Sequence, residues 1–159
     1  MRVSPFVLTA LLALSPFLRP AAAEAEIPAA GAHFGINLDR GHPQLGADVF
    51  VPLLDLSDAV SLAIWPAYTH VFLHEQRDVE LIEGNLVVSF ATRLPTIRPY
   101  AGGGLGLSFH HDTSLKLNML GGARFAVHPR VVPFVQLAIR TINGTFVDAA
   151  AGVLFPFGG

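Results

Sequence analysis

From residue 32 to residue 157 the apolar residues tend to recur at every second position, and no amphipathic helix of useful length interrupts them. This alternation is typical of β-strands, in which successive side chains point to opposite faces. We therefore predict eight strands: Ala32–Asp39, Leu45–Leu54, Ala59–Tyr68, Ile82–Arg93, Pro99–His110, Lys116–Val127, Val132–Arg140 and Thr145–Phe157.

The connections between these strands alternate in length. Those at Asp55–Asp58, Pro95–Arg98 and His128–Val131 are tight and contain Pro, Asp and Ser, which favour turns. The other four are loops, of which Thr69–Leu81 is the longest. An even number of strands with short turns at one end predicts an all-β, eight-stranded antiparallel up-and-down barrel. Both chain ends then lie at the short-turn end, as in transmembrane barrels of outer membranes.

The charged residues of the predicted strands all fall on one of the two alternating faces. The opposite face is apolar and carries no charge. Because side chains fill the interior of an eight-stranded barrel, charges placed there must be paired. We therefore predict a lumen charge network, with the apolar face against lipid. Its candidate members are Asp39, Asp48, Glu83, Arg93, Lys116, Arg124, Arg140 and Asp148.

A soluble, lipocalin-like barrel with a ligand inside would reverse the two faces and expose the charged one to water. Water-facing surfaces normally carry about a quarter to a third charged residues. The polar face here has a single lysine, Lys116, which is the only lysine of the chain. The composition therefore favours the membrane barrel, and the soluble periplasmic barrel remains the alternative.

The first 23 residues have the three parts of a secretory signal peptide. Arg2 provides a positive charge, Phe6–Leu14 an apolar stretch, and Ala21 to Ala23 a cleavage site of small residues. We predict export to the outer membrane, an unstructured lead-in at residues 24–31 and a barrel at residues 32–159. Cleavage would leave eight basic and twelve acidic residues, a net charge of −4 that argues against a nucleic-acid partner. The absence of cysteine from the sequence excludes disulfides and thiolate metal sites.

The glycine-rich run "RPYAGGGLGLSFHH" does not match a dinucleotide-binding fingerprint. After Gly102 and Gly104 that motif requires a third glycine at position 107, which is leucine. The alternation instead places Gly102, Gly104 and Gly106 on the lumen face. Glycine there would leave room for bulky neighbours and let the strand bend.

Three segments resemble the strands of the small eight-stranded outer-membrane β-barrel family, the OmpA/OmpX-like barrels of the porin-like superfamily. They are "RPYAGGGLGLSF", "GGARFAVHPRVVPFVQLAIR" and the terminal "AAAGVLFPFGG". The resemblance covers the chain from Ala32 onward. It implies contact with outer-membrane lipids and lipopolysaccharide, and insertion by the barrel-assembly machinery of Gram-negative bacteria, which reads the terminal aromatic residues. The family usually ends on Phe, whereas two glycines follow Phe157 here.

Histidines gather in or beside the predicted outer loops, where they could bind zinc, copper or nickel. The alternative is that they are solvated polar residues, and no established metal motif or cofactor signature occurs. We expect no cofactor. The candidate ligands are His70, His74, His110, His111 and Asp112.

An enzymatic role is a further alternative, because some barrels of this size modify lipid A. A nucleophile would need a serine, a histidine and a carboxylate together. Ser108 or Ser114 with His110 or His111 could supply the first two, and Asp112 or Glu83 the third. The family's His-x-Ser-Asn motif is absent from the sequence. We therefore expect a structural or surface-interaction role with a plugged lumen, possible partners being recognised by the loops.

Overall fold

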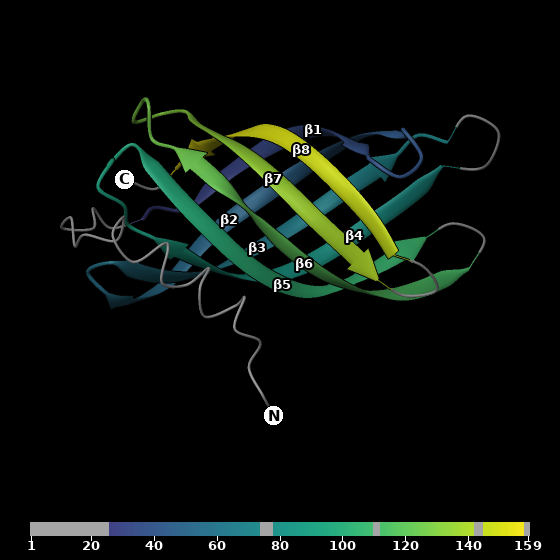
Figure 1. The fold of residues 1–159 in the computed structure, drawn as a ribbon, viewed down its shortest axis with the longest axis horizontal. Helices are drawn as coiled ribbons and strands as arrows, with labels where there is room; N and C mark the ends of the chain where they lie inside the picture. The colour runs from purple at the N-terminus through teal and green to yellow at the C-terminus, as the bar shows by residue number, and fades with distance from the viewer. Residues whose placement is uncertain (1–25, 74–77, 110–111, 142–144, 158–159) are drawn as a thin grey trace, which may run out of the picture.

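The computed structural model describes residues 26–73, 78–109, 112–141 and 145–157, so the predicted signal peptide lies outside the described residues. These residues form a closed antiparallel barrel in which each strand pairs with its sequence neighbours and β8 pairs with β1 (Figure 1). The predicted eight-stranded up-and-down barrel is confirmed. Its strands are β1 (Ala29–Asn37), β2 (Pro43–Ser57), β3 (Val60–Val71), β4 (Val79–Phe90), β5 (Ile97–Phe109), β6 (Thr113–Phe125), β7 (Val132–Thr141) and β8 (Thr145–Pro156).

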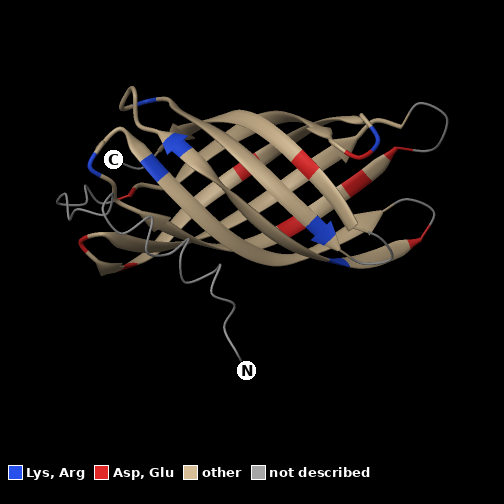
Figure 2. Ribbon diagram, viewed as in Figure 1, with Lys and Arg blue, Asp and Glu red and all other residues tan. Residues whose placement is uncertain are grey.

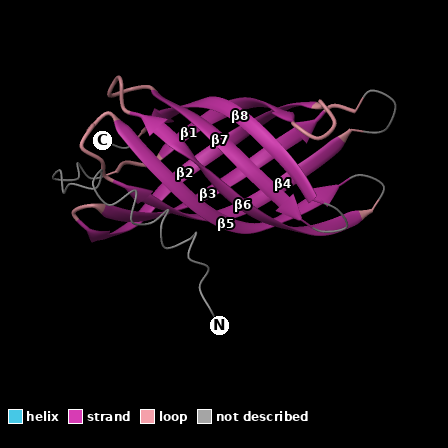
Figure 3. Cartoon of the chain, viewed as in Figure 1, coloured by secondary structure: helices cyan, strands magenta, loops and turns pink. Residues whose placement is uncertain are grey.

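The two ends of the barrel differ in their connections. The connections after β2, β4 and β6 lie at one end together with the end of β8, and we call this the turn end. The connections after β1, β3, β5 and β7 lie at the other end, the loop end. Strands run the length of the barrel between them (Figure 3). Within the described residues, no helix is long and apolar enough to cross a membrane.

Several strand bounds differ from the prediction. β1 begins at Ala29, inside the predicted lead-in of residues 24–31, because Ala29 pairs with Phe50 on one side and Pro156 on the other. β2 extends to Ser57, through most of a predicted turn. β4 ends at Phe90, and the Thr92 hydroxyl then lies 2.8 Å from the carbonyl oxygens of Leu94, in the following turn, and of Ile97, the first residue of β5.

Large apolar side chains cover the outside of the barrel. Phe34 and Met119 are 62% and 69% exposed, and other exposed large apolar residues on the strands include Ile82, Leu105 and Leu137. Exposed carboxylates within the strands occur near strand ends, at Asp55 and Glu80. Figure 2 likewise shows most charged positions of the ribbon near the two ends of the barrel. This apolar outer belt is typical of a barrel surface that contacts the hydrocarbon chains of lipids.

Glycines in β5 allow close packing of strand against strand. A Cβ at Gly104 would lie 2.0 Å from the carbonyl oxygen of Gly84 on β4. A Cβ at Gly106 would lie 2.9 Å from Cγ of Glu83. The predicted reason, room for a bulky side chain, therefore applies at Gly106, whereas at Gly104 the nearest neighbour is backbone.

Candidate functional site in the lumen

Four aromatic rings fill the middle of the lumen. The ring of Trp65 lies 5.5 Å from that of Phe50, 5.0 Å from Tyr100 and 5.2 Å from Phe134, measured between centroids. Trp65 is 1% exposed. Edge and tilted contacts of this kind are favourable for aromatic pairs. We call these four residues the aromatic layer, and it separates the two ends of the lumen.

Asp48 connects the aromatic layer to a buried histidine. Its Oδ1 accepts a hydrogen bond from Trp65 Nε1 at 3.0 Å, and its Oδ2 lies 2.7 Å from His33 Nδ1. With the Asp48 carboxylate as the acceptor, Nδ1 of His33 is the donor of this hydrogen bond. Nε2 of the same ring lies 3.3 Å from the Thr69 hydroxyl. Both carboxylate oxygens of Asp48 and both ring nitrogens of His33 therefore have a partner.

At the loop-end side of the aromatic layer, one arginine bridges two carboxylates. Arg140 donates from Nε and Nη2 to the two oxygens of Glu83, each at 2.7 Å, and from Nη1 to Asp148. This two-pronged geometry is the strong form of an arginine–carboxylate pair. Asn118 also donates to Glu83, and Asn37 donates to Asp148. We call these five residues the loop-end cluster, and all of them lie on strands.

At the turn-end side, two arginines share one carboxylate. Arg98 of β5 and Arg124 of β6 are register partners, and both donate to Glu26 Oε1, at 3.1 and 2.5 Å. Glu26 precedes β1, so its carboxylate enters the lumen from outside the strands. Arg124 also donates to Ser89, and its guanidinium lies 4.1 Å from the ring centroid of Phe50. Glu26, Arg98 and Arg124 form the turn-end cluster.

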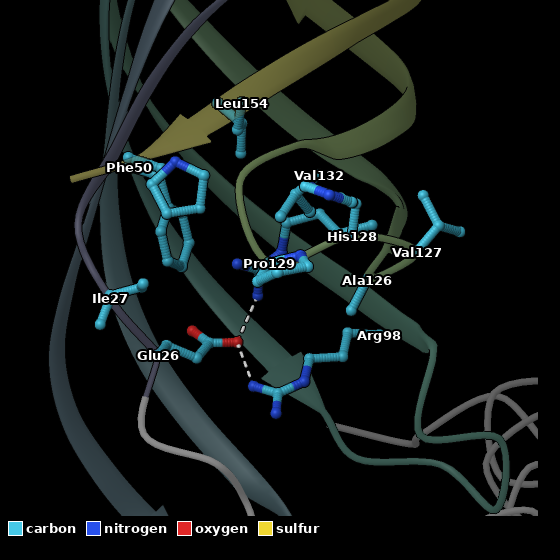
Figure 4. Close-up of a pocket in the computed structure, with 13 residues that line it drawn as sticks. Glu26, Ile27, Phe50, Arg98, Ala126, Val127, His128, Pro129, Val132 and Leu154 are labelled. Carbon is cyan, nitrogen blue, oxygen red and sulfur yellow. Dashed lines mark hydrogen bonds and ion pairs between the residues drawn. The ribbon is translucent and has the colours of Figure 1, made fainter. Parts of the chain in front are cut away.

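A cavity adjoins each cluster. The turn-end cavity has a volume of about 590 Å³ and is lined by Glu26, Arg98, Arg124 and His128 together with apolar residues (Figure 4). The loop-end cavity has a volume of about 480 Å³. Arg40 and Lys116 lie over one ring there, 5.3 and 5.8 Å from the centroid of Phe146. The aliphatic residues lining it are Val71, Leu73, Val79 and Leu81.

The structure brings five of the eight predicted lumen residues into the interior. They are at most 6% exposed, and they are Asp48, Glu83, Arg124, Arg140 and Asp148. Lys116 is half-buried beside the loop-end cavity. Asp39 and Arg93 are exposed and lie beyond the ends of β1 and β4, so strand alternation does not govern their direction. The Asp39 carboxylate instead accepts a hydrogen bond from the backbone N–H of Val147 at 2.7 Å.

Three charged or titratable lumen residues were not predicted. Glu26 falls in the segment taken as a lead-in, and Arg98 in a segment taken as a turn. His33 lies on the lumen face of the first predicted strand, so alternation alone could have found it. For Glu26 the sequence offers no comparable pattern.

Of the candidate metal ligands, His74, His110 and His111 lie outside the described residues. Nε2 of His70 lies 3.1 Å from Asp78 Oδ2, and its ring packs against Phe72 at 4.6 Å. The pKa of the Asp78 carboxyl lies below its usual value, first because it accepts the Leu73 N–H and second because of His70. Asp112 is exposed. Within the described ranges, no group of three or more potential ligands is arranged to hold a metal ion.

The candidate catalytic serines contact each other. The hydroxyl oxygens of Ser108 and Ser114 are 2.9 Å apart, across β5 and β6. Both histidines considered as their base lie outside the described residues. Glu83, considered as the orienting carboxylate, is held by Arg140. Among the described histidines, His42 lines the loop-end cavity together with both serines.

The fold defined by these elements is that of the eight-stranded transmembrane barrels. The N-terminal β-barrel domain of Pseudomonas aeruginosa OprF matches it with a TM-score of 0.61 at 17% identity, over 82% of this chain and 96% of that one. A de novo designed transmembrane β-barrel matches with a TM-score of 0.61 at 16% identity, over 86% and 100%. Ail of Yersinia pestis matches with a TM-score of 0.56 at 13% identity, over 84% and 100%.

These likenesses confirm, at the level of fold, the resemblance to small outer-membrane barrels. The amino-acid sequence matches no protein-family model and no curated protein. A natural domain and a designed barrel fit this chain equally well by TM-score. Since one fold hosts many functions, these likenesses show the fold alone.

Proposed function

We propose that this chain is an integral outer-membrane barrel with a closed lumen, which strengthens the envelope and presents its loop end to the exterior for recognition. The observation that carries the proposal is the aromatic layer inside an apolar outer belt. Asn85 joins this layer to the loop-end cluster, because it donates to the Trp65 carbonyl oxygen and accepts a hydrogen bond from Asn118. Eight strands enclose a space that side chains fill, so a passage for solutes is not expected.

The outer belt supports membrane insertion over the soluble alternative. A soluble barrel would expose Phe34, Met119 and their outward neighbours to water, at a cost of about 25 cal/mol per Å² of apolar surface. The test is electrophoresis in SDS with and without boiling, on protein extracted from the membrane fraction. A heat-dependent shift in mobility, with solubility only in detergent, is expected. Protein that is soluble without detergent and shows no shift would favour the ligand-binding barrel.

The orientation can be tested with single cysteines, since the chain has none of its own. We expect Arg40→Cys at the loop end to react with a membrane-impermeant maleimide on intact cells. Asp58→Cys, between β2 and β3, is the matched control at the turn end and should react only after the outer membrane is permeabilised. The reverse pattern would overturn the proposed orientation.

The loop-end cavity supports an anionic partner for the recognition role. Arg40 and Lys116 lie over the ring of Phe146, and these residues line the cavity together with aliphatic side chains and the carboxylates of Asp112 and Asp148. Ail, a barrel of the same fold, has been solved in complex with the heparin analogue sucrose octasulfate. We extend that ligand chemistry, an anion with many sulfates, to the loop end of this chain.

The same compound provides the test. Calorimetric titration with sucrose octasulfate should give saturable binding, weakened about tenfold when Arg40→Gln and Lys116→Gln remove two charge-assisted contacts. Arg93→Gln with Arg130→Gln removes the same charge at the turn end and should leave the affinity unchanged. If both double variants lose the same affinity for sucrose octasulfate, binding depends only on the net charge of the protein, which would contradict a loop-end site.

A further inference from the structure

The turn-end cluster holds two positive charges side by side. Arg98 and Arg124 face each other across β5 and β6, a position in which like charges repel. Each guanidinium donates to the same oxygen, Glu26 Oε1. Glu26 therefore occupies the place of an anion bound between two arginines, although it belongs to the same chain.

The fit of Glu26 to this pair is incomplete. Its second oxygen, Oε2, is buried and has no hydrogen-bond partner among the described residues, and the same is true of Nε of Arg124. Buried polar groups in proteins are nearly always satisfied, and arginine commonly binds a carboxylate with two parallel hydrogen bonds. A separate oxyanion, free to choose its orientation, could use the donor that Glu26 leaves unused.

The adjoining cavity gives such an anion room and a preferred character. Its volume is about 590 Å³. Figure 4 shows the Glu26 carboxylate and Arg98 on one side of this space and Val132 and Leu154 on the other. A charged wall opposite an aliphatic wall suits a carboxylate attached to a compact apolar body better than it suits a bare inorganic ion.

Glu26 lies on a segment outside the strand ladder. Residues 26–28 precede β1 and form no strand, and Ile27 is 42% exposed. A hydrogen bond from the Phe157 N–H to the Pro28 carbonyl links this segment to the end of β8. Withdrawal of Glu26 would break its two ion pairs and leave the strand ladder intact.

We propose that Arg98 and Arg124 form a binding site for a small amphipathic carboxylate at the turn end of the lumen, and that Glu26 occupies this site as a built-in competitor. The site faces the periplasm in the orientation proposed above. Its ligand binding does not depend on that orientation or on any partner at the loop end, so either idea can fail alone.

The test uses hexanoate as the probe, with the chain from residue 24 onward in phosphatidylcholine nanodiscs. The NMR signal of the Arg124 Nε–H group reports binding. Hexanoate should shift this signal saturably, whereas hexanol, which lacks the charge, should not. Glu26→Gln should bind hexanoate about tenfold more tightly, because the apparent affinity of a site is proportional to the fraction of molecules in which it is free.

Two arginine variants separate the site from general charge effects. Arg124→Gln should abolish hexanoate binding. Because this variant lacks the Arg124 Nε–H signal, binding is monitored by the signals of neighbouring backbone amides. Arg93→Gln, an exposed arginine at the same end, should leave it unchanged. Binding that survives Arg124→Gln, or that is missing from both the native chain and Glu26→Gln, would overturn the proposal.

Two further outcomes are decisive. If Glu26→Gln does not fold, the native chain decides: a saturable shift with hexanoate but not hexanol supports the site, and its absence overturns it. If acetate and inorganic phosphate bind as tightly as hexanoate, the site recognises bare oxyanions, and the assignment to an amphipathic carboxylate is wrong.

Discussion

At the loop end one arginine serves two carboxylates, and at the turn end two arginines serve one. Arg140 binds Glu83 and Asp148, all three from strands. Arg98 and Arg124 bind Glu26, which comes from the segment before β1. The loop-end cluster can therefore form as soon as the strands pair, whereas the turn-end cluster also requires the N-terminal segment to dock.

The two clusters also carry opposite formal charge. Counting only these ion pairs, the loop end has a net charge of −1 and the turn end of +1. The aromatic layer lies between them. This comparison yields two expectations: the loop-end cluster contributes more to stability, and the turn-end cluster is the one that can open.

The largest effect is expected from Arg140→Met. Removing this guanidinium leaves the buried carboxylates of Glu83 and Asp148 without their cationic partner. Breaking a buried ion pair in this way typically costs about 3–5 kcal/mol of unfolding free energy. Equilibrium unfolding in urea with lipid vesicles measures the loss. Adding Glu83→Gln and Asp148→Asn should recover most of it, since no unpaired charge then remains. A loss below about 1 kcal/mol would show that water reaches this cluster.

Glu26→Gln should cost less, about 1–3 kcal/mol, the range for leaving a buried hydrogen-bonding partner unsatisfied. The loss of unfolding free energy should be smaller than for Arg140→Met because Arg98 is 22% exposed and can turn toward water. The same unfolding assay applies. Glu80→Gln, an exposed carboxylate on β4, is the matched control and should change stability by less than about 0.5 kcal/mol. If Glu26→Gln costs as much as Arg140→Met, the two ends do not differ as described.

Gly106→Ala tests how tightly the loop-end cluster is packed. The added Cβ would lie 2.9 Å from Cγ of Glu83, so this side chain must move, at a cost of about 1–2 kcal/mol. Gly84→Ala on β4 is the control, because its Cβ would meet no atom within 4 Å. In the Arg140→Met background the Gly106→Ala cost should shrink, since residues in one network couple. If the stability costs of Gly106→Ala and Arg140→Met simply add, Gly106 is not coupled to the loop-end cluster.

The smallest effect concerns the connection between β3 and β4 at the loop end. Because the pKa of Asp78 is lowered in the folded chain, its contribution to stability is complete above the unfolded pKa and is lost as pH falls through the folded one. NMR titration of the Asp78 carboxyl should give a value below the ordinary one of about 3.9. His70→Gln should remove only part of the shift, since the Leu73 N–H is its larger cause. An Asp78 pKa at the ordinary value would contradict the hydrogen bonds from the Leu73 N–H and His70 to this carboxyl.

The sequence was sufficient to predict the fold because two different solvents act on the two faces of each strand. Lipid excludes charged side chains, and a filled lumen accepts only paired charges. The alternation of apolar and charged residues along a strand therefore indicates which face contacts lipid and which faces the lumen. Glu83, Arg140 and Asp148 could be assigned to the lumen in this way. Their pairing could not, because strand tilt and register decide which side chains meet.

The turn-end cluster escaped prediction for a physical reason. Glu26 lies outside any alternating segment, and its partners Arg98 and Arg124 are 72 and 98 residues away in sequence. Asp39 and Arg93 were placed in the lumen because alternation was extended past the true strand ends. Local hydrogen bonds, such as that from the Arg40 N–H to the Asn37 side chain, determine where those strands stop.

The central claim, a closed lumen, is tested most directly by hydrogen exchange at the indole of Trp65. The chain has one tryptophan, so its Nε1–H signal is identified without mutagenesis. In lipid nanodiscs transferred to D₂O we predict that this proton, bonded to Asp48 within the aromatic layer, exchanges as slowly as the strand amides. Exchange within seconds, while those amides stay protected, would mean that water passes through the barrel and would contradict the account.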